Sequence, residues 1–179
     1  MKPKLADTHP PRGFTRLAFR FPILLYHARL GWLLGDRFLL LEHTGRKSGR
    51  KREVVVEVVR YDKSTGTYIV ASGWGENSDW YRNVMKTPVV CIQSGSHRVQ
   101  ARAVRLSPRE AELELRDYAR RHPKAFRSLA RFMLGDAASS DTDNIPLLVE
   151  TIPLVAFIPD GDSIEFFKAQ DPLNSSKLD

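Results

Sequence analysis

The feature that most constrains this chain is a run of β-branched residues between two turns that contain glycine. Residues 53–61 (EVVVEVVRY) hold five valines in nine positions. This composition is typical of a β-strand, because branched side chains pack well on a pleated surface. Apolar runs at residues 37–43 and 67–72 flank it, each connected through a short polar turn. Strands joined by such short turns run antiparallel, so the sequence predicts a three-stranded meander.

Later segments extend this sheet and add helices. Further strands are predicted at residues 89–93, 97–105 and 153–159, where short apolar runs or apolar–polar alternation occur. Helices are predicted at residues 80–86, 108–121 and 124–134, the second opened by a Ser-Pro capping signal. About six strands with few helical crossovers predict an α+β fold, an antiparallel β-barrel with peripheral helices.

One folded domain with two flanking segments is expected for the 179 residues. Residues 1–34 are predicted to form a polar segment and an amphipathic helix, residues 35–169 the barrel domain, and residues 170–179 a disordered tail. The helix region carries three arginines and a proline, too many for a membrane span, so it either packs on the domain or lies as a lid or on a membrane surface. A cytoplasmic location is expected, with membrane association left open.

A net charge of +7 and an isoelectric point near 9.8 favour anionic partners. The charge gathers in residues 44–52 (TGRKSGRKR), where five of the last seven residues are basic. Gly45 and Gly49 allow a tight turn that exposes N–H groups, and Ser48 adds a hydroxyl donor, a combination suited to phosphate. A strand follows, so this is not a Walker loop. The residues alone leave open a phosphorylated ligand, nucleic-acid contact or a solvated turn.

A second segment, residues 71–83 (ASGWGENSDWYRN), combines small and aromatic residues. Small residues at a strand end let a flat ligand approach the backbone closely. Trp80 and Tyr81 either wall such a site or belong to the core. Asn83, three positions after Trp80, is suited to hydrogen-bond a ligand or a local turn, and Asp79 is expected to cap the helix.

Taken together, these two segments resemble the deazaflavin-dependent nitroreductase family of split β-barrel proteins. The resemblance is carried by residues 39–52, by Ala71 and Ser72, and by DWYRN followed by a Thr-Pro-Val strand start, and it spans about residues 35–104. It implies a split barrel that binds coenzyme F420. It also implies an oxidoreductase that transfers a hydride between the reduced coenzyme and a small acceptor, as nitroreductases and quinone reductases do.

The resemblance further implies which residues hold the coenzyme. In the family, the basic turn grips the phosphate and acidic tail, the deazaflavin ring lies along the next strand and the small-residue turn, and the W-Y-x-N segment closes the site. The matching positions are Arg46, Lys47, Ser48, Gly49, Arg52, Val54, Val56, Ala71, Ser72, Trp80, Tyr81 and Asn83. No side chain is assigned a catalytic role. No metal ion is expected, because the five histidines show no ligand spacing.

Two rival interpretations stay open. The same fold can hold FMN or haem, for which His43 and His97 are the candidate axial ligands. Alternatively, the basic turn and the N-terminal helix bind a lipid, a membrane or a nucleic acid without catalysis. The enzyme hypothesis expects a small-molecule acceptor and no specific nucleic acid, and leaves a homodimer and peripheral membrane contact open.

Two other groups of reactive side chains are expected to be inert. Glu110, Glu112 and Glu114 are interpreted as a solvated helix face rather than as acid–base pairs. Cys91, the single cysteine, lies in an apolar run and is expected to be a buried thiol.

Overall fold

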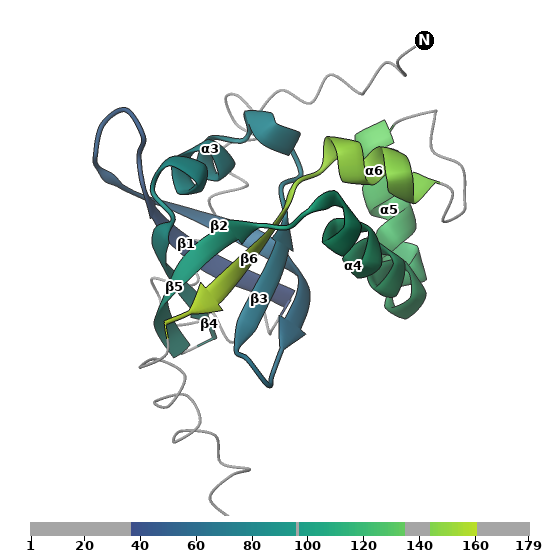
Figure 1. Cartoon of the computed structure of the whole chain (residues 1–179), viewed down its shortest axis with the longest axis horizontal. Helices are drawn as coiled ribbons and strands as arrows, with labels where there is room; N and C mark the ends of the chain where they lie inside the picture. Colours follow the sequence, from purple (N-terminus) through teal and green to yellow (C-terminus); the bar gives the residue numbers. More distant parts are fainter. Residues whose placement is uncertain (1–36, 96, 135–143, 161–179) are drawn as a thin grey trace, which may run out of the picture.

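The computed structural model describes residues 37–95, 97–134 and 144–160 (Figure 1). The predicted N-terminal segment, residues 1–34, and the predicted tail, residues 170–179, lie outside these ranges, as do residues 135–143, most of a polar stretch expected to form a loop. None of the described helices is long and apolar enough to cross a membrane.

Six antiparallel strands close a barrel in the order β1-β2-β3-β6-β5-β4. They are β1 (Phe38–Thr44), β2 (Lys51–Asp62), β3 (Thr67–Ala71), β4 (Val89–Ser94), β5 (His97–Arg105) and β6 (Leu154–Pro159). Every predicted strand is present, and no strand end differs from its predicted position by more than two residues. The predicted α+β class and antiparallel barrel are therefore confirmed.

The barrel interior is filled by alternate side chains of the strands. In β1, Leu39 and Leu41 point inward and are fully buried, and β5 contributes Val99, Ala101 and Ala103. Helix α3 (Asp79–Lys86) closes one end of the barrel with Trp80, Tyr81 and Val84, which belong to the same apolar cluster. Period-two alternation thus determines which face of each strand forms this core.

A second apolar cluster lies outside the barrel. Helices α4 (Pro108–Arg121), α5 (Pro123–Leu134) and α6 (Ile145–Thr151) cover the outer faces of Ile69, Leu154 and Ala156. Figure 1 shows these helices on one side of the barrel, while the turn between β1 and β2 extends from the opposite side. The basic turn therefore lies on the side of the barrel that helices α4, α5 and α6 do not cover.

The helices and their N-caps agree with the sequence predictions in part. The Ser107 capping box of α4 is confirmed, because the Ser107 amide donates to Glu110 Oε2 at 2.8 Å and the Glu110 amide donates back to Ser107 Oγ at 3.3 Å. Helix α6 was not predicted, because seven residues are too short to display a helical period. Ser78, rather than the predicted Asp79, occupies the N-cap of α3.

Candidate functional site

The first half of β2 has a strand partner on one side only. Its register runs from Lys51 opposite Thr44 to Glu57 opposite Phe38 in β1, whereas pairing with β3 begins at Val58. Within the described part of the chain, the second edge of this segment therefore presents backbone groups without a strand partner. Val54 is half-buried on this segment, and Val56 is buried with the barrel core.

The small-residue turn after β3 is held by its own hydrogen bonds. The Ser72 amide donates to the carbonyl of Pro153 at 3.0 Å, and Ser72 Oγ donates to the carbonyl of Gly75 at 2.8 Å. Gly75 has φ +58°, and a Cβ there would lie 2.9 Å from the Thr151 carbonyl oxygen. Ser72 is fully buried and fixes this loop, while Ala71 remains half-buried at the end of β3.

The turn between β1 and β2 is closed by backbone hydrogen bonds that require its glycines. The Gly45 amide donates to the Arg50 carbonyl and the Gly49 amide donates to the Gly45 carbonyl, both at 2.8 Å. Gly49 has φ +64°, a conformation that strains other residues. The Arg50 amide donates to Ser48 Oγ at 3.3 Å, so the exposed Ser48 hydroxyl hydrogen stays free to donate.

The five cations of this turn fall into two groups. Arg46 Nη1 lies 2.9 Å from Asp79 Oδ1, and Lys51 forms an ion pair with the buried Glu42. The side chains that have neither an ion pair nor a hydrogen bond to any described residue are those of Lys47, Arg50 and Arg52, and all three are exposed. We call these three the free cations. Arg50 was not among the predicted site residues, although the sequence places it in the same turn.

A buried polar pair ties the turn to α3. Asn83 Oδ1 accepts hydrogen bonds from the amide and the Nη1 of Arg46, both at 3.0 Å. Asn83 Nδ2 lies 3.1 Å from His43 Nδ1, and Lys86 Nζ donates to the Arg46 carbonyl at 3.0 Å. Asn83 and His43 are each 5% exposed. Asn83, predicted as a coenzyme contact, is therefore occupied with Arg46 and His43.

His43 is the site residue that sequence reasoning did not place in this network. Burial lowers its pKa to about 4, assisted by the positive charge of Arg52 and opposed by Asp79 and by a hydrogen bond with the Thr44 backbone. The imidazole is therefore neutral at pH 7. The sequence did hold a signal for this network, because two adjacent polar residues, Glu42 and His43, end an otherwise apolar strand. Both side chains are buried in the structure.

The aromatic residues of the W-Y-x-N segment belong mainly to the barrel core. Trp80 and Tyr81 are 5% and 4% exposed, and the Trp80 ring centroid lies 6.4 Å from that of Phe157. Arg105 approaches the Tyr81 ring at 5.9 Å, and burial raises the pKa of Tyr81. The structure thus brings the turn, Asn83 and Asp79 together, and it places the rings of Trp80 and Tyr81 in the barrel core.

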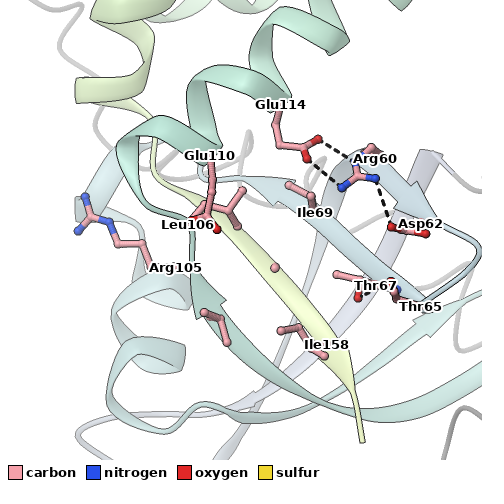
Figure 2. Close-up of a pocket in the computed structure, with 12 residues that line it drawn as sticks. Arg60, Asp62, Thr65, Thr67, Ile69, Arg105, Leu106, Glu110, Glu114 and Ile158 are labelled. Atoms are coloured by element: carbon pink, nitrogen blue, oxygen red, sulfur yellow. Dashed lines mark hydrogen bonds and ion pairs between the residues drawn. The ribbon is translucent and has the colours of Figure 1, made fainter. Parts of the chain in front are cut away.

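A concave region, the α4 groove, lies between α4 and the outer faces of β3, β5 and β6, away from the basic turn (Figure 2). Its cavity is about 300 Å³. Arg60 donates from Nε and Nη2 to the two carboxylate oxygens of Glu114, each at 2.8 Å, and Arg105 pairs with Glu76 at 2.7 Å. None of the predicted coenzyme residues lines this groove.

Two expectations about other polar groups need correction. Glu114 is not part of a solvated face, because Arg60 of the barrel binds it, although Glu112 does pair with Arg116 along the helix. Cys91 is half-buried rather than buried, and its Sγ accepts a hydrogen bond from Arg98 Nε at 3.0 Å. Across the described ranges, no group of three histidine, cysteine or acidic residues is placed to hold a metal ion.

Comparison with known proteins identifies the family. Residues 27–151 match the family model described as F420H(2)-dependent quinone reductase. Rv3178 of Mycobacterium tuberculosis, which is named as a candidate F420H(2)-dependent quinone reductase, is 36% identical over 114 residues that cover 62% of this chain and 86% of that protein.

Two solved structures align with most of this chain. The F420-H2 dependent reductase FDR-A is 22% identical with a TM-score of 0.46, over 69% of this chain and 95% of that one. Atu2129 of Agrobacterium tumefaciens, of unknown function, is 18% identical with a TM-score of 0.50, over 87% of this chain and 59% of that one.

The family match covers well over half of the sequence and confirms the predicted enzyme class and coenzyme over the FMN, haem and non-enzymatic alternatives. The chain belongs to the F420H(2)-dependent quinone reductase family and is an oxidoreductase that uses coenzyme F420.

Proposed function

We propose that coenzyme F420 lies along the first half of β2 and that the free cations Lys47, Arg50 and Arg52 hold its phosphate and acidic tail. The observation that carries the proposal is the combination of three cations that have no ion pair with a described residue and an adjacent edge of β2 that has no strand partner in the described ranges. Cations that are not committed to carboxylates of the chain are available to an anionic ligand.

The chemistry of the donors fits the coenzyme. Guanidinium groups bind phosphate and carboxylate through paired N–H donors, and an ammonium group acts on them as a point charge. The peptide groups of the β2 edge offer donors and acceptors to a flat ring, and Ala71 has too small a side chain to obstruct it. Ser48 and Gly49 of the same turn complete the proposed site.

The reduced deazaflavin supplies a hydride when it is bound, and the chain contributes binding and orientation. We propose a quinone as the small-molecule acceptor, because quinone reduction is what describes the family. A quinone that receives a hydride and a proton from solvent becomes a quinol, so the reaction balances without a further reactant.

Titration of the purified full chain with oxidised coenzyme F420, followed by coenzyme fluorescence, tests the site. The wild type is expected to bind with a micromolar or lower Kd, and the double variant Lys47→Ala, Arg52→Ala to bind at least tenfold more weakly. A matched control, Arg109→Ala with Lys124→Ala, removes the same charge from exposed positions of α4 and α5 and should change Kd less than twofold. Absence of wild-type binding at high coenzyme concentration would refute the proposal.

A second assay tests the acceptor. Reduced coenzyme F420 mixed with menadione, a soluble quinone, should be oxidised in a reaction that depends on the protein and consumes the two reactants in equal amounts. Oxidation of the coenzyme at the same rate with and without menadione would argue against a quinone acceptor.

A further inference from the structure

His43 and Asn83 form a buried pair that lies directly behind the basic turn. His43 belongs to β1 and Asn83 to α3, and forty positions of sequence separate them. Both side chains are almost fully buried, so any effect they have on a ligand acts through the residues they hold. The first such residue is Arg46, whose backbone and side chain both donate to Asn83.

The hydrogen bonds of Arg46 determine how the Asn83 amide is oriented. The Arg46 amide and guanidinium can only donate, so the oxygen of Asn83 must face them and its nitrogen must face away. That nitrogen meets His43 Nδ1, which accepts only when it carries no proton. A neutral His43 with its proton on Nε2 is therefore the state in which Nδ1 accepts the hydrogen bond from Asn83 Nδ2.

The orientation of Asn83 has a consequence for the free cations. Arg46 is the residue immediately before Lys47, and it is additionally held by Asp79 and by Lys86, both of α3. Fixing Arg46 fixes where the turn leaves β1. The same contact therefore sets where Lys47 and Arg50 lie relative to the edge of β2, whereas Arg52 already belongs to β2 and pairs with His43 of β1.

We propose that His43 is a positioning residue for coenzyme binding, which orients Asn83 so that Asn83 holds Arg46 and the basic turn in the geometry that receives the anionic tail. The proposal rests on the coenzyme site proposed above. It assigns a role in ligand affinity to two side chains that the ligand does not need to touch.

Two variants of His43 separate the hydrogen bond from simple packing. His43→Asn keeps an acceptor near the position of Nδ1, whereas His43→Leu has a similar volume to histidine and no acceptor. We expect His43→Leu to raise the Kd for oxidised coenzyme F420 by about tenfold and His43→Asn to stay within about threefold of the wild type. Equal Kd values for wild type and His43→Leu would overturn the proposal.

General loss of stability needs its own control. Val155→Ala truncates a fully buried side chain of the barrel interior, which destabilises the fold away from the turn. Its Kd should equal that of the wild type at a temperature where every variant is folded by circular dichroism. If Val155→Ala weakens binding as much as His43→Leu does, the effect of His43 is general destabilisation and the proposal fails.

A double-mutant cycle tests whether His43 acts through Asn83. The variant His43→Leu, Asn83→Leu should bind no more weakly than Asn83→Leu alone, because the histidine has no function once the amide is gone. Effects that multiply in the double variant would show that His43 acts by a separate route and would overturn this step.

A measurement without the coenzyme makes failure of the two proposals distinguishable. In ¹⁵N–¹H spectra of the free protein, His43→Leu should shift or broaden the amide signals of residues 45–50, and His43→Asn should largely restore them. Unchanged turn signals in His43→Leu would overturn the positioning role. A wild type that fails to bind the coenzyme would instead refute the coenzyme site, whatever these spectra show.

Discussion

The β1–β2 turn and the α4 groove are both rich in charge, and they differ in how that charge is used. In the groove, Arg60 is bound by Glu114 and Asp62 (Figure 2). Arg105 is bound by Glu76, and Glu110 completes the helix cap. In the turn, Lys47, Arg50 and Arg52 have no ion-pair partner among the described residues. Charge that is satisfied within the chain supports the fold, whereas unsatisfied charge is available for a ligand.

The largest expected effect comes from removing all free cations together. The triple variant Lys47→Ala, Arg50→Ala, Arg52→Ala should weaken binding of oxidised coenzyme F420 by about a hundredfold or more, because each charge-assisted hydrogen bond contributes roughly 1.5–3 kcal/mol. The groove counterpart, Arg60→Met with Glu114→Gln, should leave the Kd unchanged. Isothermal titration calorimetry measures both Kd values. A larger loss of affinity in the groove variant than in the turn variant would contradict this assignment of the binding charge.

The pH dependence of stability is expected to be the next largest effect. The unfolded chain protonates His43 near pH 6.5, whereas the folded chain holds its pKa near 4. Between these values the unfolded state binds more protons, so the free energy of unfolding falls as the pH falls from 6.5 to 4, by about 2–3 kcal/mol.

Urea denaturation at pH 7, 5.5 and 4 measures this effect. His43→Asn should lose less stability than the wild type over that range, since asparagine does not titrate. Parallel pH profiles for the two proteins would contradict a buried neutral His43.

Breaking the Arg60–Glu114 ion pair of the groove should lower the free energy of unfolding and leave the affinity for the coenzyme unchanged. Glu114 is 16% exposed at its side chain and Arg60 is 35% exposed, so Glu114→Ala leaves a partly desolvated guanidinium without its main partner. We expect a loss of about 1 kcal/mol in urea denaturation. Arg50→Ala in the turn should change stability by less than about 0.5 kcal/mol, because its side chain pairs with none of the residues that the structure describes.

An effect of similar size is expected from the shape of the turn. Gly49→Ala places a side chain at φ +64° and should cost about 1 kcal/mol of unfolding free energy. Gly73→Ala, at a loop position with open space and no positive φ, should be close to neutral. A neutral Gly49→Ala would indicate that the turn is not held in the left-handed conformation.

The barrel could be predicted from the sequence because its pattern is local. The valines of residues 53–61 and the alternation of residues 97–105 specify strands and their buried faces without reference to the rest of the chain. The Ser107 cap was equally readable, since its partner Glu110 lies three positions away. Helix α6 escaped prediction because it is short and its helicity depends on packing against α4 and α5.

The division of the turn's cations could not be predicted, because it depends on distant partners. Arg46 is neutralised by Asp79, which lies 33 positions away, and Lys51 by Glu42 of the neighbouring strand. The sequence presents five similar basic residues, and only the folded barrel brings carboxylates close enough to pair with some of them. For the same reason the sequence could not show that His43 and Arg46 both bind the amide of Asn83.

The most direct test of the central claim is to locate the coenzyme on the protein by ¹⁵N–¹H chemical shift mapping with oxidised coenzyme F420. The account predicts that the largest shifts fall on the amides of residues 45–56, along the turn and the open edge of β2, while those of Thr67, Val104 and Ile158 in the α4 groove stay in place. Shifts concentrated in the groove, with the turn unaffected, would contradict it.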